Sequence, residues 1–226
     1  MGWRACFIGA LSFVGLLYSE EGIFDSTIPL LDMREFRAPE TREQFVQKVS
    51  DAMHTVGFFA VINPDVDMEA LKKGYESAIE FFNSPIELKD QIHDDALNGQ
   101  RGYVHSEVAQ GNGAFDYKEF CHIGKTNNLW PDWMDLKTPM ENLVANLDKN
   151  GEELSRAFAL ALGIPEESFL EMTRTGECLL RPIHYPKNPA PGATWAAKHT
   201  DIDFFTILPM ATEEGLQVYH QGHWID

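Results

Sequence analysis

Basic side chains are scarce in this sequence. Its 226 residues include 18 Lys and Arg against 35 Asp and Glu, which gives a formal net charge of -17. Duplex nucleic acid is held mainly by Lys and Arg side chains that neutralise its phosphates. The charge balance therefore argues against nucleic acid as a partner.

Cysteine is also rare. The chain has three cysteines at wide spacings, Cys6, Cys121 and Cys178. An odd number without Cys-x-x-Cys pairs matches neither a disulfide scaffold nor a common zinc pattern. We expect ordinary thiols.

The apolar run near the N-terminus is short. It extends from Cys6 to Tyr18, whereas a typical membrane span needs about 20 residues. It follows Arg4 and has the length of a signal-peptide core, but no clear Ala-x-Ala cleavage site comes after it. Residues 1–25 are therefore a candidate signal peptide or N-terminal extension. We expect a cytoplasmic protein, with export or membrane tethering through residues 1–18 as the alternative.

The overall composition is ordinary, with 44% hydrophobic and 23% charged residues. Such values are typical of a soluble globular protein. The length fits one hydrophobic core, because single domains commonly reach about 250 residues before they divide.

Hydrophobic periodicity predicts that helices dominate the first part of the chain. The apolar spacing from Thr41, a suitable N-cap, to Gly57 predicts an amphipathic helix. Further helices are expected over 68–83, from Pro85 to about His93, and over 138–162. Two short strands are also expected, one before the first helix at 28–33 and one after it at 58–62.

The second part of the chain changes to strand patterns. A long loop is expected over 98–113, rich in Gly and Asn. Strands are predicted over 179–185, 198–208 and 216–219, the last followed by a turn at Gln221-Gly222. The sequence thus predicts helices first and β-structure second.

The strongest local signal for chemistry is His199-Thr200-Asp201. On a strand, residues two apart point to the same face, so an imidazole and a carboxylate there would share one metal ion. Such a pair is two thirds of the 2-His-1-carboxylate triad that binds Fe(II) in oxygenases. A hydrogen-bonded polar patch is the alternative explanation of the spacing.

Two nearby patterns are weaker candidates. His93-Asp94-Asp95 has the same spacing, but we expect a helix there, on which the two side chains diverge. Asp203 shares a strand face with His199, yet four strand residues span about 13 Å, too far for one metal ion.

Several sequence blocks together resemble the isopenicillin N synthase-like, 2-oxoglutarate- and Fe(II)-dependent oxygenases. No single block is specific, but they occur in the family's order. The blocks are Ile28-Pro29-Leu30-Leu31-Asp32, Gly57-Phe58-Phe59-Ala60-Val61-Ile62-Asn63, Phe81-Phe82-Asn83-Ser84-Pro85 through Lys89, Arg101-Gly102-Tyr103, Asp116-Tyr117-Lys118-Glu119-Phe120, Arg181-Pro182-Ile183-His184-Tyr185-Pro186, His199-Thr200-Asp201, and Gly215-Leu216-Gln217-Val218 with Gly222-His223-Trp224.

This resemblance implies an α+β fold in which N-terminal helices flank a double-stranded β-helix, or jelly roll, that is incomplete in this chain. Residues 26–175 would form the N-terminal helical part of the oxygenase. Residues 176–226 would form the first, truncated part of the jelly roll.

The resemblance also implies a site for Fe(II), O2 and the cosubstrate 2-oxoglutarate. His199 and Asp201 would hold the metal, while Tyr185 and Arg181 would lie on the cosubstrate side. A packing role for Tyr185 and an ion pair of Arg181 with Glu177 or Asp203 are the alternatives. For the polar residues of the earlier blocks, Arg101, Tyr103, Asp116 and Lys118, we expect structural hydrogen bonds or ion pairs.

The family's second ligating His and its Arg-x-Ser are not found in this sequence, and His220 and His223 are poor candidates for the third ligand. We therefore expect a fragment. The hypotheses are a 2-oxoglutarate-dependent oxidoreductase acting on a small molecule, an Fe(II) oxidase that does not use 2-oxoglutarate, and a catalytically inactive interaction module. The oligomeric state and the substrate are not specified by the sequence.

Overall fold

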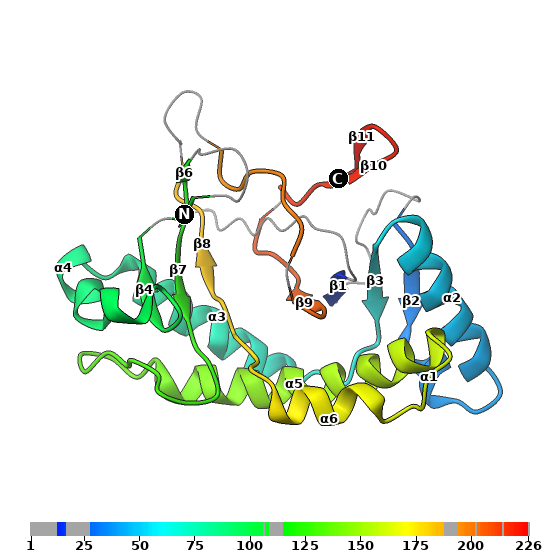
Figure 1. The fold of residues 1–226 in the computed structure, drawn as a ribbon. Helices are drawn as coiled ribbons and strands as arrows, with labels where there is room; N and C mark the ends of the chain where they lie inside the picture. Colours follow the sequence, from blue (N-terminus) through cyan, green and yellow to red (C-terminus); the bar gives the residue numbers. More distant parts are fainter. Residues whose placement is uncertain are drawn as a thin grey trace. The chain divides into compact units, whose positions relative to one another are not determined.

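The structure is a computed structural model that describes residues 13–16, 28–105, 107–108, 115–187, 194–201, 203–213 and 215–225. Apart from 13–16, the candidate targeting segment and Cys6 lie outside these residues. The chain forms two compact units (Figure 1). Unit 1 contains Val66–Lys149 and Thr173–Ala197, and unit 2 contains Arg4–Asp65, Asn150–Met172 and Lys198–Asp226, each over its described residues.

Unit 2 is built on a parallel sheet with the strand order β2-β3-β1-β9. The predicted strand at 58–62 is confirmed as β3, with four buried residues, and the strand predicted at 28–33 is confirmed in its central part as β2. Strand β1 comes from the N-terminal apolar run and pairs with both β3 and β9. The strands are β1 (Phe13–Leu16), β2 (Leu30–Asp32), β3 (Phe58–Ile62) and β9 (Thr206–Pro209).

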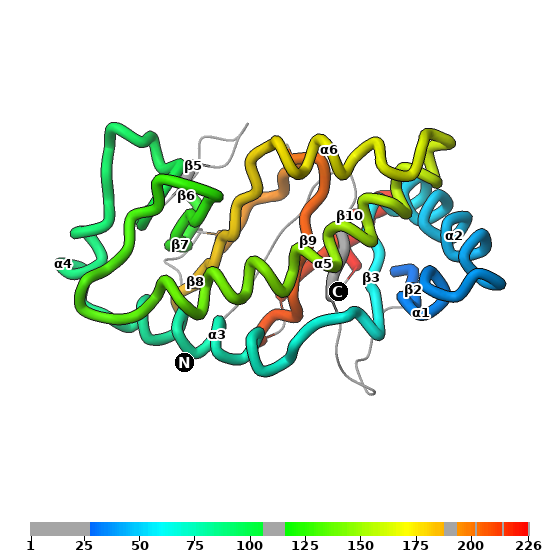
Figure 2. The backbone as a smooth tube through the Cα atoms, turned by 90° about the horizontal axis from the view of Figure 1, so that it is seen from below, coloured from blue at the N-terminus to red at the C-terminus, as the bar shows by residue number. Residues whose placement is uncertain are grey.

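Two helices follow β2 in the chain and pack beside it, α1 (Met33–Arg37) and α2 (Arg42–Thr55), as Figure 2 shows. The prediction of α2 is confirmed, and the helix ends where the Gly57 amide donates to the Ala52 carbonyl at 2.9 Å. The capping prediction is wrong in one respect. Thr41 takes the N-cap position, but its hydroxyl oxygen accepts no hydrogen bond from the first-turn amides of α2. The hydroxyl instead donates to the Glu35 carbonyl at 2.9 Å.

The last described element is a hairpin of β10 (Val218–His220) and β11 (His223–Ile225). Its turn residues Gln221 and Gly222 have φ values of 48° and 88°, as a two-residue hairpin turn requires. The predicted turn is confirmed. Val218 and Ile225 are buried in a cluster with residues of β3.

Unit 1 contains helix α3 (Met68–Asn83), which confirms the predicted 68–83, and the shorter helices α4 (Ile86–Lys89), η1 (Asp90–Ile92) and η2 (Asp95–Leu97). They accompany an antiparallel sheet of β4 (Gly102–Val104), β7 (Glu119–His122) and β8 (Ile183–His184). A second pair is formed by β5 (Glu107–Val108) and β6 (Phe115–Asp116).

Two expectations for unit 1 need correction. The stretch 98–113 is not one surface loop, because β4 lies within it and Tyr103 is 2% exposed. The strand predicted at 179–185 is reduced to β8, with an isolated bridge between Leu180 and Ile123. The backbone around Pro182 does not continue a regular ladder, since proline lacks the N–H that a ladder needs.

Helix α5 (Lys137–Ala161) contributes residues to both units and matches the predicted long helix, with Gly163 after it at φ 69°. Helix α6 (Ser168–Thr175) was not predicted. None of the described helices combines the length and apolar character needed to cross a bilayer.

The core of unit 1 joins α3, the sheet and the start of α5. Cys121 is buried in it as a thiol outside any disulfide, and burial raises its pKa to about 12. Cys178 is an exposed thiol that is likewise outside any disulfide. The expectation of ordinary thiols is confirmed for these two residues. The buried members of the cluster are Ala78, Phe81, Phe82, Ile92, Tyr103, Cys121, Ile123, Leu136 and Met140.

A carboxylate also lies in the interior of unit 1. Glu119 of β7 accepts from Lys89 Nζ at 2.6 Å and His184 Nδ1 at 2.7 Å, and from the Tyr103 hydroxyl. Burial alone would raise the pKa of Glu119, but the hydrogen bonds from His184, Lys89 and Tyr103 together outweigh it and lower that pKa. Glu119 therefore stays charged and joins α4, β4 and β8 to β7.

Removing this charge should destabilise the protein. We expect Glu119→Gln to lower the free energy of unfolding by about 3 kcal/mol at pH 7, because it leaves the buried Lys89 ammonium without a counter-charge. The lowered pKa means that the stabilisation is complete above the unfolded-state pKa of Glu and is lost as the pH falls through the folded-state value. Urea unfolding between pH 7 and 3 should show the two proteins converging at low pH. The control Glu87→Gln, at an exposed site on α4, should have a free energy of unfolding within about 0.5 kcal/mol of wild type. A difference between wild type and Glu119→Gln that does not change with pH would contradict the stabilising role of the Glu119 charge.

Gly102 is required at its position by both conformation and space. Its φ is 74°, and a Cβ there would lie 2.0 Å from the Ile92 carbonyl oxygen. Gly57 has a similar φ of 73° with nothing within 4 Å. We expect Gly57→Ala to lower the free energy of unfolding by about 1 kcal/mol, because only the backbone conformation is strained. We expect Gly102→Ala to lower it by about 3 kcal/mol, because the clash of the new Cβ adds to the conformational strain. Equal shifts in urea midpoint would disprove the steric part of this explanation.

Candidate metal centre

His199 and Asp201, the pair predicted from spacing, lie close together in unit 2. His199 Nε2 is 3.7 Å from Asp201 Oδ1, and the two side chains are 21% and 10% exposed. Two ligand atoms that bind one divalent ion at right angles, each about 2.1 Å from it, are about 3 Å apart. A small side-chain rotation closes the difference, so the pair fits a shared metal ion.

We expected a regular strand with both side chains on one face to explain this proximity, and that explanation is wrong. The strand expected over 198–208 begins only at Thr206, and His199 and Asp201 precede it in irregular backbone. Their approach therefore does not come from the alternation of a regular strand. Asp203, which we expected not to join the pair, is exposed.

Thr206, the first residue of β9, orients the carboxylate. Its hydroxyl donates to Asp201 Oδ2 at 2.5 Å, while Asp201 Oδ1 faces the imidazole. Partners of this kind fix ligand orientation and strengthen metal binding. Nothing in the sequence indicates this role beyond a Thr five residues after the Asp.

Lys198, directly before His199, is held by the hairpin. Its ammonium lies 3.3 Å from the centre of the Tyr219 ring and 6.0 Å from that of Trp224. An ammonium over an aromatic face is attracted by the negative electrostatic potential of that face, which arises from the quadrupole of the ring. The hairpin thus contacts the backbone stretch that carries the metal pair.

The described residues contain no group of three or more His, Cys, Asp or Glu side chains arranged to hold a metal. His220 and His223 face each other across the β10–β11 hairpin and do not complete a triad with His199 and Asp201. The candidate centre among the described residues is therefore the pair of His199 and Asp201.

The second His-x-Asp pattern forms an ion pair, which corrects our expectation that it lies on a helix. His93 has extended backbone, with φ -97° and ψ 135°, and its Nε2 is 3.0 Å from Asp95 Oδ1. Its Nδ1 bonds to the Tyr103 carbonyl at 2.8 Å. This hydrogen bond is the largest cause that raises the pKa of His93, and the bond to Asp95 is the next largest. The Asp95 side chain is fully exposed.

Tyr185 and Arg181 belong to unit 1. Tyr185 is buried, at 1% exposure. Arg181 Nε donates to His122 Nε2 at 2.5 Å, and its guanidinium lies over the Phe120 ring, 4.8 Å from the centre. Glu177, one alternative partner of Arg181, accepts from Arg101 at 3.0 Å.

The structural contacts expected for the other family-like polar residues are present. Arg101 pairs with Glu177, and the Tyr103 hydroxyl donates to Glu119. Asp116 and Lys118 form an ion pair of 2.9 Å whose side chains are 1% and 5% exposed.

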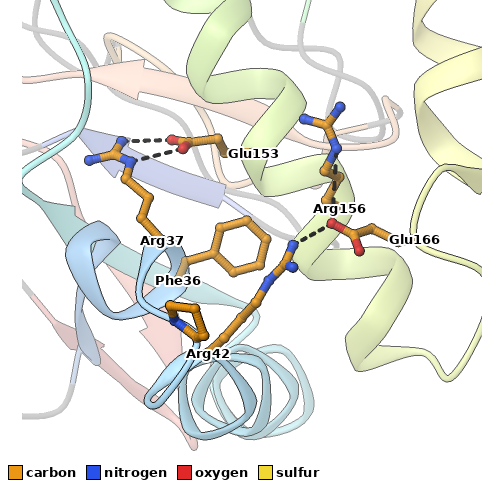
Figure 3. A pocket seen from close by; sticks show the side chains of 7 residues that line it. Phe36, Arg37, Arg42, Glu153, Arg156 and Glu166 are labelled. Carbon is orange, nitrogen blue, oxygen red and sulfur yellow. Dashed lines mark hydrogen bonds and ion pairs between the residues drawn. The ribbon is translucent and has the colours of Figure 1, made fainter.

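A separate depression of about 520 Å³ lies in unit 2, lined by residues of α1, α2 and α5 together with Pro39 and Glu166 from the neighbouring loops. Figure 3 shows its arginines turned toward carboxylates. Arg37 binds Glu153 through two bonds of 2.8 and 2.6 Å, and Arg42 binds Glu166. Because the charges compensate each other, we interpret this cluster as a link between helices rather than an anion-binding site.

The sequence matches a profile described as the N-terminal region of the non-haem dioxygenases in morphine synthesis, over residues 28–142, about half of the chain. Among curated proteins it is 27% identical to "1-aminocyclopropane-1-carboxylate oxidase homolog 9" of Arabidopsis thaliana, covering 88% of this chain and 56% of that protein. It is 28% identical to a "2-oxoglutarate-Fe(II) type oxidoreductase" of Aspergillus fumigatus, covering 88% of this chain and 67% of that protein.

The chain is also similar to solved structures. A full-length Neurospora crassa protein in complex with alpha-KG is 25% identical, with a TM-score of 0.68 over 77% of this chain and 61% of that one. The chain spans little more than half the length of the first of these curated relatives. The sequence blocks, the match over 28–142 and these relatives lead to one conclusion: the chain belongs to the 2-oxoglutarate/Fe(II)-type family of non-haem dioxygenases.

Proposed function

We propose that this chain contributes the His199 and Asp201 ligands of a non-haem Fe(II) centre that oxidises a small organic molecule with O2 and 2-oxoglutarate. The observation that carries the proposal is the approach of these two side chains to 3.7 Å, with Thr206 bonded to the far carboxylate oxygen. An imidazole and a carboxylate with open neighbouring positions suit Fe(II) and O2 chemistry. The relatives named as oxidase homologs and a 2-oxoglutarate-Fe(II) oxidoreductase support the same reaction class.

The protein residues would bind and orient rather than react. His199 would offer Nε2 and Asp201 would offer Oδ1, while the Thr206 hydroxyl holds Oδ2 away from the metal position. The bound iron would supply the oxidising chemistry, in which O2 converts 2-oxoglutarate into succinate and CO2 and delivers one oxygen atom to the substrate.

The cosubstrate side of the site is part of the same proposal. Tyr185 and Arg181 would lie near 2-oxoglutarate, in keeping with the family resemblance of the Arg181 to Pro186 block. The contacts of Arg181 with His122 and Phe120 would fix the direction of its guanidinium.

The proposal also includes the finer fold. Residues 26–175 would form the helical N-terminal part and residues 176–226 the beginning of a jelly roll, with the third metal ligand coming from residues outside the described ones. Strand β9 follows the metal pair in the chain, and the β10–β11 hairpin comes after β9.

Metal titration tests the two ligands directly. We expect His199→Ala and Asp201→Ala each to reduce Co(II) affinity, measured by calorimetry without O2, by about 100-fold or to abolish it, because each removes one of two protein ligands. His223→Ala, an exposed histidine on the hairpin, is the matched control and should bind as wild type. Equal binding by all four proteins would overturn the proposed centre.

A turnover assay tests the reaction class. The protein from its natural source, with its intact mass measured, should form succinate from 2-oxoglutarate only with Fe(II) and O2, and His199→Ala should stop it. O2 consumption without succinate would indicate an oxidase that does not use 2-oxoglutarate. Metal binding without either reaction would leave an inactive module.

A further inference from the structure

Asp116 has an unusual environment for a carboxylate. It is 2% exposed, and its two oxygens have separate partners. Oδ2 accepts from Lys118 Nζ at 2.9 Å, and Oδ1 accepts from the backbone amide of Ala197 at 2.9 Å. The ion pair lets Lys118 compensate the charge of this buried carboxylate, while Oδ1 serves as the acceptor of the Ala197 amide.

The backbone around Ala197 is held at other points too. Asp116 and Thr194 form a parallel bridge, and the Tyr117 amide donates to the Thr194 carbonyl at 2.7 Å. The Trp195 indole donates to the Pro186 carbonyl at 2.8 Å. The segment 194–197 is therefore fixed to the chain around Asp116 by backbone and side-chain bonds within unit 1.

This fixed segment ends two residues before His199. Two residues of chain span at most about 7 Å, so a hold on the Ala197 amide limits the positions open to the His199 backbone. On the far side of the pair, the Thr206 hydroxyl holds Asp201. Each restraint acts within one unit: the Ala197 amide is held in unit 1, and the Asp201 carboxylate is held in unit 2.

We propose that Asp116 is a positioning residue for the metal centre: its carboxylate, neutralised by Lys118, holds the Ala197 amide and so restricts the backbone that carries His199. The inference rests on the proposed metal site. The proposed role differs from that of a purely structural ion pair in one respect. The acceptor at Oδ1 affects metal affinity because it holds the Ala197 amide, whereas the negative charge of Asp116 only compensates the buried Lys118 ammonium.

A pair of double variants separates these two roles. Asp116→Asn with Lys118→Met removes both charges and retains a side-chain oxygen for the Ala197 amide. Asp116→Leu with Lys118→Met has a similar volume and removes the acceptor as well. Asp116→Glu keeps the charge and displaces the acceptor, and it provides a second comparison if the Leu variant does not fold.

The first measurement needs no metal. Amide exchange at Ala197 and 15N relaxation at residues 197–201 should be close to wild type in the Asn variant. In the Leu variant the Ala197 amide should exchange faster and His199 should become more mobile. Unchanged mobility of His199 in both the Leu and the Glu variants would overturn the inference, whether or not the protein binds metal.

The second measurement is the affinity for Co(II). Only the binding that is lost in His199→Ala is attributed to the metal centre. We expect the Leu and Glu variants to bind about 10-fold more weakly than wild type, as for other residues that orient a metal ligand, and the Asn variant to bind within about 2-fold of it. Equal affinities in all variants would overturn the positioning role and leave the metal site standing. No His199-dependent binding in wild type would overturn the metal site itself, and the mobility result would then decide whether Asp116 still restrains this backbone.

Discussion

A buried carboxylate must have partners for its charge and for both oxygens, and this requirement organises much of unit 1. Asp116 and Glu119 are three residues apart, and both are satisfied by groups distant in sequence. Glu119 receives Lys89, Tyr103 and His184, whereas Asp116 receives Lys118 and the Ala197 amide. The short segment that carries both residues therefore joins a helix, two neighbouring strands and the segment before the metal pair.

The elements that the sequence predicts well are those whose pattern is local. Helix α3 and strand β3 have the predicted bounds because their apolar spacing and their terminal residues agree. Helix α6 follows α5 after a short break and was missed. Tyr103 was placed in a loop because the stretch 98–113 is rich in Gly and Asn, yet pairing with β7 buries it. Such pairing depends on residues far along the chain.

The candidate site divides in the same way. His199 and Asp201 are identifiable because their side-chain chemistry and spacing stand together in the sequence, although the regular strand that suggested the pairing is not there. Their supports are not identifiable in this way. The Thr206 hydroxyl, the Tyr219 ring under Lys198 and the Asp116 carboxylate act through contacts that only the folded chain creates. The links from Tyr185 and Arg181 to the cosubstrate stay a prediction.

The hold on Ala197 uses a backbone amide, and this affects how the chain can vary during evolution. Every residue except proline offers the same N–H, so position 197 is free to change its side chain within the space around it without losing the bond. Positions 116 and 118 have no such freedom, because a change at one leaves a buried charge at the other. Natural variants should therefore change Asp116 and Lys118 together, while the residue that receives the bond drifts almost independently.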